Sequence, residues 1–406
     1  MTTPVSVVVV SRNRPDALER CLTALAQVDH PDVEVVVVCD VRSAPAIARA
    51  GVEAVVRQVP FEEPNISAAR NAGIAAASGE IVAFLDDDAV PEPRWLSHLC
   101  APSEDPRVLA AGGFVLGRNG ISPQWQGRLA FADATTADLP LDGDGPHLIE
   151  GASGRGIKTE GTNMAVRRET LVAMGGFDEA FAFYLDETDL NLRLGEARAV
   201  TALVPLAVVH HGFAASDRRT ADRVPRDLHE IGASLAVFLR KHGRTRHPLP
   251  EPHRTERRRT LLTHMRDGRM MPGCVDRLMA TFDAGWAEGL DRALDRTVVL
   301  PDPPERLRFP TAVRPHERIT ARFWRARTAR EQAAQAVRDG AVVSLLLLSY
   351  STLYHRVRFT RDGVWEQRGG QFGRAERSEP LMQIVPAGAR ALREARRVER
   401  VRVPKP

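Results

Sequence analysis

Residues 81–88 of the chain read Ile-Val-Ala-Phe-Leu-Asp-Asp-Asp, an apolar run that ends in three adjacent carboxylates. The five apolar residues predict a buried strand, and successive side chains of a strand alternate between its two faces. Asp86 and Asp88 should therefore point to one side, and Asp87 to the other. Two converging carboxylates repel each other, and a hard divalent cation relieves that repulsion. The stretch predicts a strand that ends at a site for a hard divalent cation, the alternative being acids that cap a helix.

Similar apolar runs precede this strand, and segments with helical spacing separate them. The predicted strands upstream are Val5–Val10, Val33–Cys39 and Val52–Val56. The predicted helices begin at Pro15 and cover Ile66–Ala77. Strands that alternate with helices in this way predict an α/β fold with a parallel sheet and right-handed crossovers. Ligands of such sheets bind beyond the carboxyl ends of the strands, where the three aspartates lie.

The pattern changes after Gly212, which divides the chain into three predicted parts. Residues 1–215 contain the α/β pattern, with a weakly patterned stretch at 119–156 that predicts a long loop with short elements. Residues 216–300 predict a helical extension. Residues 301–406 predict an α+β region of unknown role. The predicted helices of these two parts are 218–242, 254–292 and 316–338, and the predicted strands that follow are Val342–Ser349, His355–Thr360 and Val364–Gln367, before a basic tail.

Composition indicates a folded protein of the cytoplasm. Apolar residues make up 43% of the 406 residues and charged residues 27%, which is typical of globular proteins. The longest apolar runs are far shorter than the roughly 18 residues that cross a bilayer. The chain begins directly with a strand-like run, so we expect no secretory signal. The four cysteines are scattered without paired spacing, which indicates reduced and buried thiols.

Charge is distributed unevenly along the chain. Residues 1–215 contain 17 basic and 29 acidic residues, whereas the remainder contains 39 basic and 23 acidic residues. This asymmetry predicts that the C-terminal half contacts a membrane surface or another polyanion. A second explanation stays open, namely a solvated arginine-rich surface, since the chain has only three lysines, Lys158, Lys241 and Lys405.

Two further segments carry polar residues in unusual places. Asn65-Ile-Ser-Ala-Ala-Arg-Asn-Ala-Gly73 sets Arg70 on an otherwise apolar, alanine-rich helix, where a guanidinium can reach a phosphate or an aspartate. Residues 175–193 place Asp186, Glu187 and Asp189 at the start of a helix. Such acids are either ordinary partners of the helix dipole or a general base aimed at a hydroxyl group.

The order of these motifs resembles family 2 glycosyltransferases of the GT-A fold. The resemblance covers about residues 4–212 and rests on Val-Val-Val-Ser-Arg-Asn-Arg-Pro, Ala-Ala-Arg-Asn-Ala-Gly-Ile, Leu-Asp-Asp-Asp-Ala and Gly-Gly-Phe-Asp-Glu followed by Asp-Glu-Thr-Asp-Leu. Each motif alone is weak, but four in the family's order and spacing are specific. The resemblance implies a nucleotide-binding GT-A fold with a mostly parallel central sheet for residues 1–215. A helix-rich C-terminal region ending in a few strands would follow.

The resemblance also implies where a nucleotide-sugar donor binds. Ser11, Arg12 and Arg14 follow the first strand, where the base and ribose lie in the family. Asp40 matches the family's contact to the base, although the usual Asp-Asp-Gly-Ser is here Cys39-Asp-Val-Arg-Ser43. The other implied donor-binding residues are Arg70, Asp86 and Asp87.

The remaining implied roles concern the metal and the base. Asp88 would coordinate Mg²⁺ or Mn²⁺ across the diphosphate, and His211 lies where GT-A enzymes can place a further contact to the metal. Glu187 aligns with the second acid of the family's Glu-Asp pair, which is the usual base. Here the order is Asp186-Glu187, so Asp186 and Asp189 stay open as the catalytic carboxylate.

These roles predict a metal-dependent glycosyltransferase that moves a sugar to an acceptor hydroxyl by a single inverting displacement. The expected acceptor is a glycan or a lipid-linked glycan, as in bacterial surface polysaccharide biosynthesis. We expect no nucleic acid partner, and a cytoplasmic protein with peripheral contact to the inner face of the membrane. Two alternatives were weighed. A sugar nucleotidyltransferase would need a glycine-rich phosphate loop, which residues 11–14 lack. A catalytically silent GT-A-like binding or scaffold module would have lost a carboxylate at Asp88 or Glu187.

Overall fold

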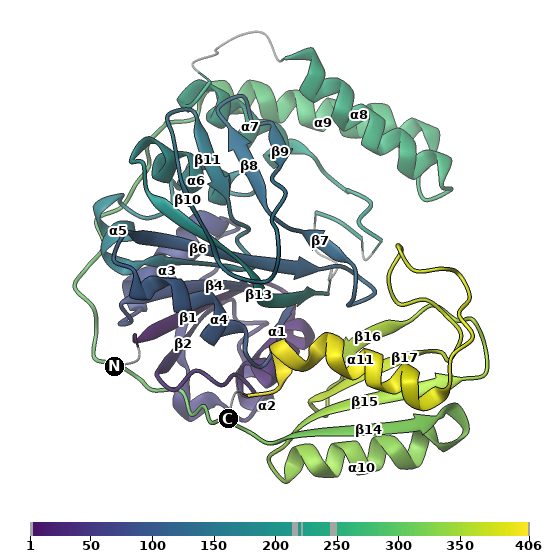
Figure 1. Ribbon diagram of the computed structural model, residues 1–406. Coiled ribbons are helices and arrows are strands. Elements are labelled where there is room, and N and C mark those ends of the chain that lie inside the picture. The colour runs from purple at the N-terminus through teal and green to yellow at the C-terminus, as the bar shows by residue number, and fades with distance from the viewer. Residues whose placement is uncertain (1–2, 213–217, 221, 244–249, 405–406) are drawn as a thin grey trace.

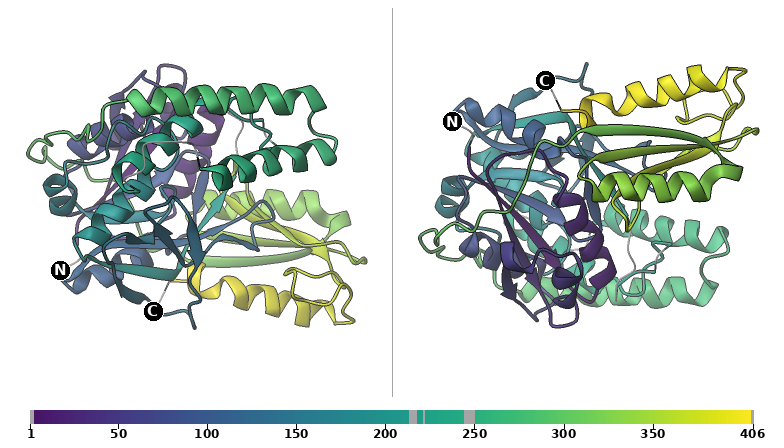
Figure 2. Two further views of the ribbon diagram at one scale, coloured as in Figure 1. Left: turned by 90° about the horizontal axis from the view of Figure 1, so that it is seen from above. Right: turned by 90° about the horizontal axis from the view of Figure 1, so that it is seen from below.

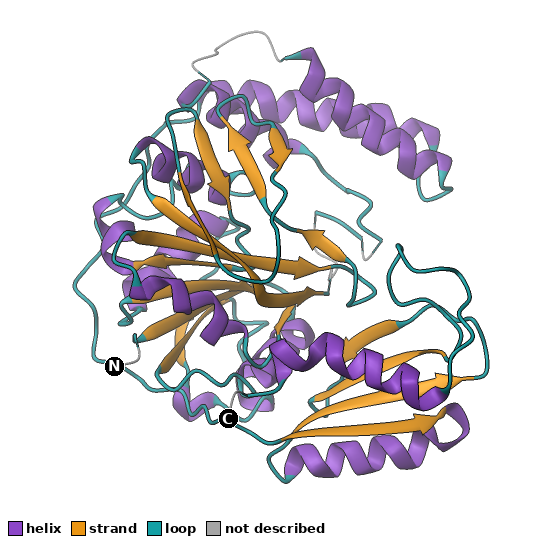
Figure 3. Cartoon of the chain, in the orientation of Figure 1, coloured by secondary structure: helices purple, strands orange, loops and turns teal. Residues whose placement is uncertain are grey.

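The computed structural model describes residues 3–212, 218–220, 222–243 and 250–404. A large mixed α/β unit forms one side of the molecule, and a smaller sheet with two helices lies against it (Figure 1). Figure 3 shows that helices flank both sheets. The predicted α/β class is confirmed.

The central sheet orders its strands β10-β13-β6-β12-β4-β1-β2-β3, with β5 and β7 paired at the margins. Six of these eight strands run in one direction, because β12 and β10 alone are antiparallel to their neighbours. The mostly parallel sheet is thereby confirmed. The strands are β1 Val5–Ser11, β2 Val33–Cys39, β3 Arg57–Pro60, β4 Ile81–Asp86, β5 Ala89–Pro91, β6 Val108–Leu116, β7 Pro123–Trp125, β10 His147–Glu150, β12 Met164–Arg167 and β13 Val200–His211.

Helices cover both faces of this sheet and explain its apolar strands. Residues such as Val7 and Val35 pack against one set of helices, α1 Pro15–Leu25, α2 Pro45–Arg49 and α4 Trp95–Cys100. Residues of the opposite face, such as Val8 and Phe84, pack against α3 Ile66–Ala76, α5 Arg168–Ala173 and α6 Asp186–Glu196. A strand buried on both faces has no polar side to show, which accounts for its continuous run of valines.

A second, helical layer packs on α6. Its helices are α7 His229–Lys241, α8 Glu251–Arg266 and α9 Pro272–Asp291, and a three-stranded sheet of β8 Arg128–Phe131, β9 Thr136–Asp138 and β11 Arg155–Lys158 lies beside them. Leu192 of α6 shares a core with Phe238 and Phe282 of this layer. The helix that begins with Asp186 and Glu187 is therefore held between the central sheet and the helical layer.

The C-terminal sheet orders its strands β14-β15-β17-β16, with α10 and α11 on opposite faces (Figure 2). Its elements are β14 His316–Arg322, α10 Ala326–Arg338, β15 Val342–Ser349, β16 Arg356–Phe359, β17 Val364–Gly370 and α11 Ala387–Arg402. Trp365 is buried against the first domain, where its indole Nε1 donates a hydrogen bond to Gln27 Oε1 at 3.2 Å. Gln27 Nε2 in turn donates to the Gly363 carbonyl at 2.7 Å.

Four predicted elements differ from the structure. Glu53–Val55 is a 3₁₀ turn, and the third strand lies at 57–60 instead. The described residues between 218 and 228 are not helical, and helix α7 begins at His229. Residues 316–322 form strand β14 in place of the start of a helix, because they pair with β15. The basic tail forms helix α11, so the chain does not end on strands. Within the described residues, no helix has the length and apolar character needed to span a bilayer.

Candidate active site

A cavity of about 630 Å³ opens at the carboxyl ends of β1 and β4. It is the place that parallel strand order predicts for a ligand. Nine of the twelve predicted site residues line it, namely Ser11, Arg12, Arg14, Arg70, Asp86, Asp88, Asp186, Glu187 and His211. The other three, Asp40, Asp87 and Asp189, do not line the cavity.

Asp86, Asp88 and His211 form a cluster that can hold a metal ion. One ligand atom of each lies within 4.8 Å of the others. His211 comes from the end of β13, and its Nε2 lies 3.2 Å from Asp88 Oδ1. Two carboxylates and an imidazole are a donor set that suits Mn²⁺, and the carboxylates suit Mg²⁺. The residues therefore fit the metal implied by the sequence.

Asp88 also lies beside two guanidinium groups. Its Oδ2 is 3.4 Å from Arg14 and 3.7 Å from Arg219. With His211 these groups surround a carboxylate that is almost completely buried. The cations around the cluster thus balance its negative charge in this structure. A metal ion bound together with an anionic ligand would need a similar balance of charge.

Asp87 points away from Asp86 and Asp88, as strand alternation predicts, and lies behind the cavity, which does not support the donor-binding role that the resemblance implies. Its side chain is fully buried, accepts a hydrogen bond from Ser11 Oγ at 2.7 Å and pairs with Arg14 at 2.7 Å. Burial raises its pKa to about 7, although the Arg14 guanidinium opposes that rise. Asp87 therefore holds two lining residues and does not itself face a donor.

Asp40 likewise supports the loop after β1. Its carboxylate accepts hydrogen bonds from the backbone N–H groups of Asn13, at 3.1 and 3.2 Å, and of Ser43, at 3.0 Å. The side chain is nearly buried and turned away from the cavity lining. The predicted contact to a nucleotide base is not supported by this placement, because the carboxylate oxygens are engaged with the loop.

Arg70 links the metal cluster to the acidic start of α6. It lies on α3, which begins where Asn65 accepts a hydrogen bond from the Ala68 N–H. The Arg70 guanidinium forms a buried ion pair with Asp186 and lies 3.5 Å from Asp86. These pairs raise its pKa even though burial acts against the charge. A fully charged guanidinium therefore lies between two groups of acids.

The backbone before α6 is strained. Tyr184 and Leu185 have φ angles of 78° and 66°, in the left-handed region that side chains other than glycine rarely adopt. Each such residue costs on the order of 1–3 kcal/mol and is tolerated where its surroundings fix it. Here Leu185 is buried in the core of the helical layer, and the two residues turn the chain so that Asp186 and Glu187 enter the cavity.

Lys158 was not predicted as a site residue. Its Nζ lies 3.0 Å from Glu187 Oε1, 3.5 Å from Glu160 and 3.2 Å from Thr188 Oγ1. Burial would raise the pKa of Glu187, but the charges of Lys158 and Arg70 outweigh it and hold that pKa below its usual range. Burial raises the pKa of Glu160, which also lines the cavity. Glu187 is therefore a charged carboxylate at neutral pH.

Asp189 is excluded from the cavity by its place on the helix. Its side chain is fully buried and pairs with Arg193 at 2.8 Å, Lys241 at 2.9 Å and His242 at 2.8 Å. These contacts lower its pKa far below the usual range despite burial. Asp189 fastens α6 to α7 and does not line the cavity, which argues against it as the alternative base.

Sequence reasoning also missed a group of arginines that line the cavity after β13, Arg218, Arg219 and Arg226. We had assigned them to an arginine-rich helix. With Arg12, Arg14 and Arg70 they give the cavity a strongly cationic lining, in which Arg14, Arg70 and Arg219 contact the carboxylates directly. The excess of basic residues after position 215 was the signal that pointed to them.

Comparison with known proteins identifies the family of the first part of the chain. Residues 6–165 match the model of the family described as glycosyl transferase family 2. This region belongs to glycosyl transferase family 2. The matched residues include β1, α3 and β4, and hence Arg14, Arg70 and both aspartates of the metal cluster. The predicted family is confirmed.

Relatives of the family 2 region include two bacterial proteins. The O-antigen biosynthesis protein RfbC of Myxococcus xanthus is 28% identical over 63% of this chain and 20% of its own length. The pre-mycofactocin glycosyltransferase of Mycobacterium tuberculosis is 29% identical over 59% of this chain and 49% of its own length. The chain thus spans at most half of these relatives. Among solved structures, the mannosyltransferase PcManGT from Pyrobaculum calidifontis aligns with 72% of this chain and 76% of its own, with a TM-score of 0.42 and 18% identity.

Proposed function

We propose that the protein is a glycosyltransferase that moves a sugar from a nucleoside diphosphate to an acceptor hydroxyl. The observation that carries this proposal is the shared cavity of the Asp86–Asp88–His211 cluster and Glu187. A diphosphate needs positive charge around it, and a hydroxyl nucleophile needs a nearby carboxylate. The cavity supplies both: Asp86 and Asp88 come from the family 2 region, and Glu187 and His211 come from the chain that follows it.

The donor's diphosphate fits the cationic part of the cavity. Arg14 and Arg219 already lie at Asp88, and Arg218 and Arg226 line the same wall. Asp86, Asp88 and His211 would hold Mg²⁺ or Mn²⁺. A bound ion of this kind neutralises charge on the leaving nucleoside diphosphate. Ser11 and Arg12, at the end of β1, would face the nucleoside.

Glu187 is the residue that we assign as general base. Lys158 and Arg70 keep its carboxylate charged, so it can accept the proton of an acceptor hydroxyl that attacks the anomeric carbon. Asp186 is committed to its buried pair with Arg70. Attack from the side opposite the leaving diphosphate gives a single displacement with inversion. Glu160 is another carboxylate of the cavity and also contacts Lys158, and a comparison of variants separates Glu160 from Glu187.

The acceptor that we propose is a glycan or a lipid-linked glycan of surface polysaccharide synthesis. The names of two further relatives support this class. They are the glucosyl-dolichyl phosphate glucuronosyltransferase of Haloferax volcanii, 31% identical over 29% of this chain, and the N-acetylglucosaminyl-diphospho-decaprenol L-rhamnosyltransferase of Mycobacterium tuberculosis, 33% identical over 22%. Both names describe transfer to a sugar on a polyprenyl carrier.

The test is a screen of nucleotide sugars for release of nucleoside diphosphate with Mn²⁺. We expect one donor to give release that chelation stops and added Mn²⁺ restores. Binding of donors without any release, with or without acceptor glycans, would favour the catalytically silent module. Release that continues in excess chelator would contradict the metal role while leaving the transferase intact.

A further inference from the structure

Large exposed apolar side chains gather at one end of the molecule. They come from three segments that are far apart in the sequence: the turn between α8 and α9, the ends of β14 and β15, and the loop from 371 to 386 between β17 and α11. All three segments lie at the same end in Figure 1 and in both views of Figure 2. We call this set the apolar end, and its members are Met271, Trp324, Tyr350, Leu381, Met382 and Ile384.

The exposure of these side chains is unusual for so large a group. Ile384 is 85% exposed, Met271 73% and Leu381 71%. Single exposed apolar residues need no explanation, but a group at one end marks an interaction surface. The described residues at this end leave the group open to solvent, which favours an interaction with a partner.

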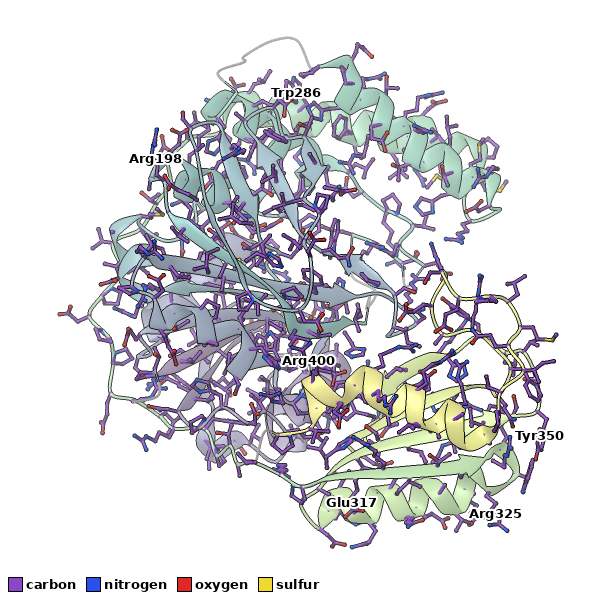
Figure 4. All side chains as sticks on the ribbon, in the orientation of Figure 1. Arg198, Trp286, Glu317, Arg325, Tyr350 and Arg400 are labelled. Atoms are coloured by element: carbon purple, nitrogen blue, oxygen red, sulfur yellow. The ribbon has the colours of Figure 1, made fainter. Side chains whose placement is uncertain are left out.

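An aromatic pair forms the part of the apolar end that belongs to the C-terminal sheet. The rings of Trp324 and Tyr350 are stacked, 5.9 Å apart and inclined by 22°, and the Arg322 guanidinium lies 3.9 Å from the Tyr350 ring centre. Figure 4 shows Tyr350 and Arg325 at the outer end of this domain, whereas Glu317 lies nearer the middle of the molecule. Tryptophan and tyrosine with flanking arginine are typical of the boundary between water and lipid headgroups.

Basic residues accompany every segment of the apolar end. Arg269 precedes Met271, Arg325 follows Trp324, and Arg377 lies in the loop of Leu381, all three exposed. At the α8–α9 turn, Arg266 and Arg269 share a single acid, Asp267, which leaves that tip positive. Residues 216–406 hold 39 basic and 23 acidic residues, and although some of these arginines pair with acids of the first 215 residues, as Arg306 does with Asp32 and Arg402 with Glu92, the half keeps an excess of positive charge. Charge complementarity therefore selects an anionic partner.

We propose that the apolar end docks on an anionic lipid bilayer. The aliphatic tips at 271 and 381–384 would enter the boundary of the headgroups, the aromatic pair would lie level with the headgroups, and the arginines would contact lipid phosphates. Attachment is peripheral, because no helix in the described ranges can span the membrane. A bilayer suits three separated tips at one end, since it is flat and offers both charge and apolar depth.

This inference rests on the proposed function in one respect: docking would bring the cavity to a lipid-linked acceptor. Binding to lipid requires no turnover and is measured separately. Loss of vesicle binding with donor hydrolysis intact would overturn the docking surface alone. Vesicle binding without any donor chemistry would overturn the proposed function alone.

The experiment is flotation of the full chain with vesicles of phosphatidylcholine, alone or mixed with phosphatidylglycerol, at low and high salt. We expect the chain to bind the anionic vesicles, and we expect high salt to weaken that binding. The double variant Leu381→Asp/Ile384→Asp should lower that binding by about tenfold or more, because it replaces two inserting side chains by charges that lipid repels. Arg325→Glu should lower it less and should remove part of the salt dependence.

The matched control is Val299→Asp. Val299 is completely exposed but belongs to the linker between α9 and β14, which runs along the opposite side of the molecule (Figure 1). Circular dichroism and thermal melting check that each variant folds. Equal binding by the double variant and the control, or negligible binding to both kinds of vesicle, would overturn the proposal. So would a dimer in light scattering that the double variant converts to monomer, since the apolar end would then be covered by a second copy.

Discussion

At the scale of single residues, neighbours in the sequence have separate tasks because backbone geometry turns them apart. At the end of β4 and in the turn that follows it, Asp86 and Asp88 face the cavity while Asp87 holds Ser11 and Arg14 from behind. Along β13 the same alternation separates two histidines. His211 joins the metal cluster, whereas His210 pairs with Glu92 at 2.7 Å on the other side. Substitutions one position apart should therefore have different consequences.

The metal cluster makes a direct prediction. Asp88→Asn should weaken Mn²⁺ binding by at least about 100-fold, since even partners outside the first shell of a metal contribute 10–100-fold. Turnover should be abolished together with binding. Calorimetric titration with Mn²⁺ alone measures the affinity. Asp138→Asn, at an acid whose side chain is 87% exposed, is the control. Unchanged affinity in Asp88→Asn would remove Asp88 from the metal site.

Lys158 should set the pH range in which Glu187 acts. Its ammonium group helps to lower the pKa of Glu187, so Lys158→Met should raise that pKa. The acid limb of the kcat/KM profile should then move to higher pH by about 1–3 units, the usual effect of an adjacent opposite charge. Lys158→Arg keeps the positive charge, so its acid limb should stay close to the wild-type position. An acid limb that stays in place in Lys158→Met would show that another group, such as Glu160, controls it.

At the scale of elements, the two sides of α6 have different roles: one side faces the cavity and the other forms buried ion pairs with α7. A helix turns by about 100° per residue, so residues two apart point in nearly opposite directions. Glu187 therefore faces the cavity, while Asp189 faces α7 and its Lys241 and His242. Helical periodicity alone could have excluded Asp189 as a partner of Glu187, because the start of the helix at Asp186 was already predicted.

Asp189→Asn should consequently destabilise the fold while it spares the chemistry of the folded fraction. Removing one partner of a buried ion pair costs on the order of 3–5 kcal/mol, and here Arg193, Lys241 and His242 would all lose the carboxylate that they share. We expect a clear drop in melting temperature and faster hydrogen exchange in α6 and α7. At a temperature where the variant is folded, its kcat should stay within a few-fold of wild type. A folded variant with kcat lowered as far as in Glu187→Gln would contradict this division.

The strands could be predicted from sequence where burial on both faces leaves a continuous apolar run, as at Val5–Ser11 and Val342–Ser349. Strand β11 could not, because its short run is covered on one side by α6 and has no simple period. Because Lys158 lies on β11, it was not predicted as a site residue either. A compositional signal was nevertheless present, since two of only three lysines, Lys158 and Lys241, contact acids of α6.

At the scale of the whole molecule, the C-terminal helix is fastened to the family 2 region beside its metal cluster. Arg402 of α11 donates two hydrogen bonds of 2.7 Å to Glu92. The Glu92 carboxylate also lies 2.7 Å from His210 Nε2. His210 precedes the metal-cluster residue His211, and its ring lies 5.0 Å from that of Trp365. The sequence could not reveal this contact, because its members are more than 300 residues apart.

The Glu92–Arg402 pair should make this attachment dependent on pH. Burial opposes the charge of Glu92, but Arg402 and His210 outweigh it and lower its pKa to about 2 from 4.5. A lowered pKa stabilises the folded state above the unfolded value, and this contribution is lost as pH falls from 4.5 toward 2. Glu92→Gln should therefore melt several degrees lower at pH 7, with a difference that shrinks below pH 4.5. The exposed Glu317→Gln is the control, and a difference independent of pH would contradict the pair.

The most direct test of the account is the transfer rate of Glu187→Gln, measured beside its affinity for the donor. With the donor identified by the screen, we predict that kcat falls by about 10²–10⁴-fold, the usual contribution of a general base. The Kd of the donor should stay within a few-fold of wild type, since Glu187 faces the acceptor hydroxyl and not the diphosphate. Glu160→Gln, at the other cavity carboxylate that contacts Lys158, should be the milder variant. A Glu187→Gln enzyme that transfers sugar at the wild-type rate would contradict the account.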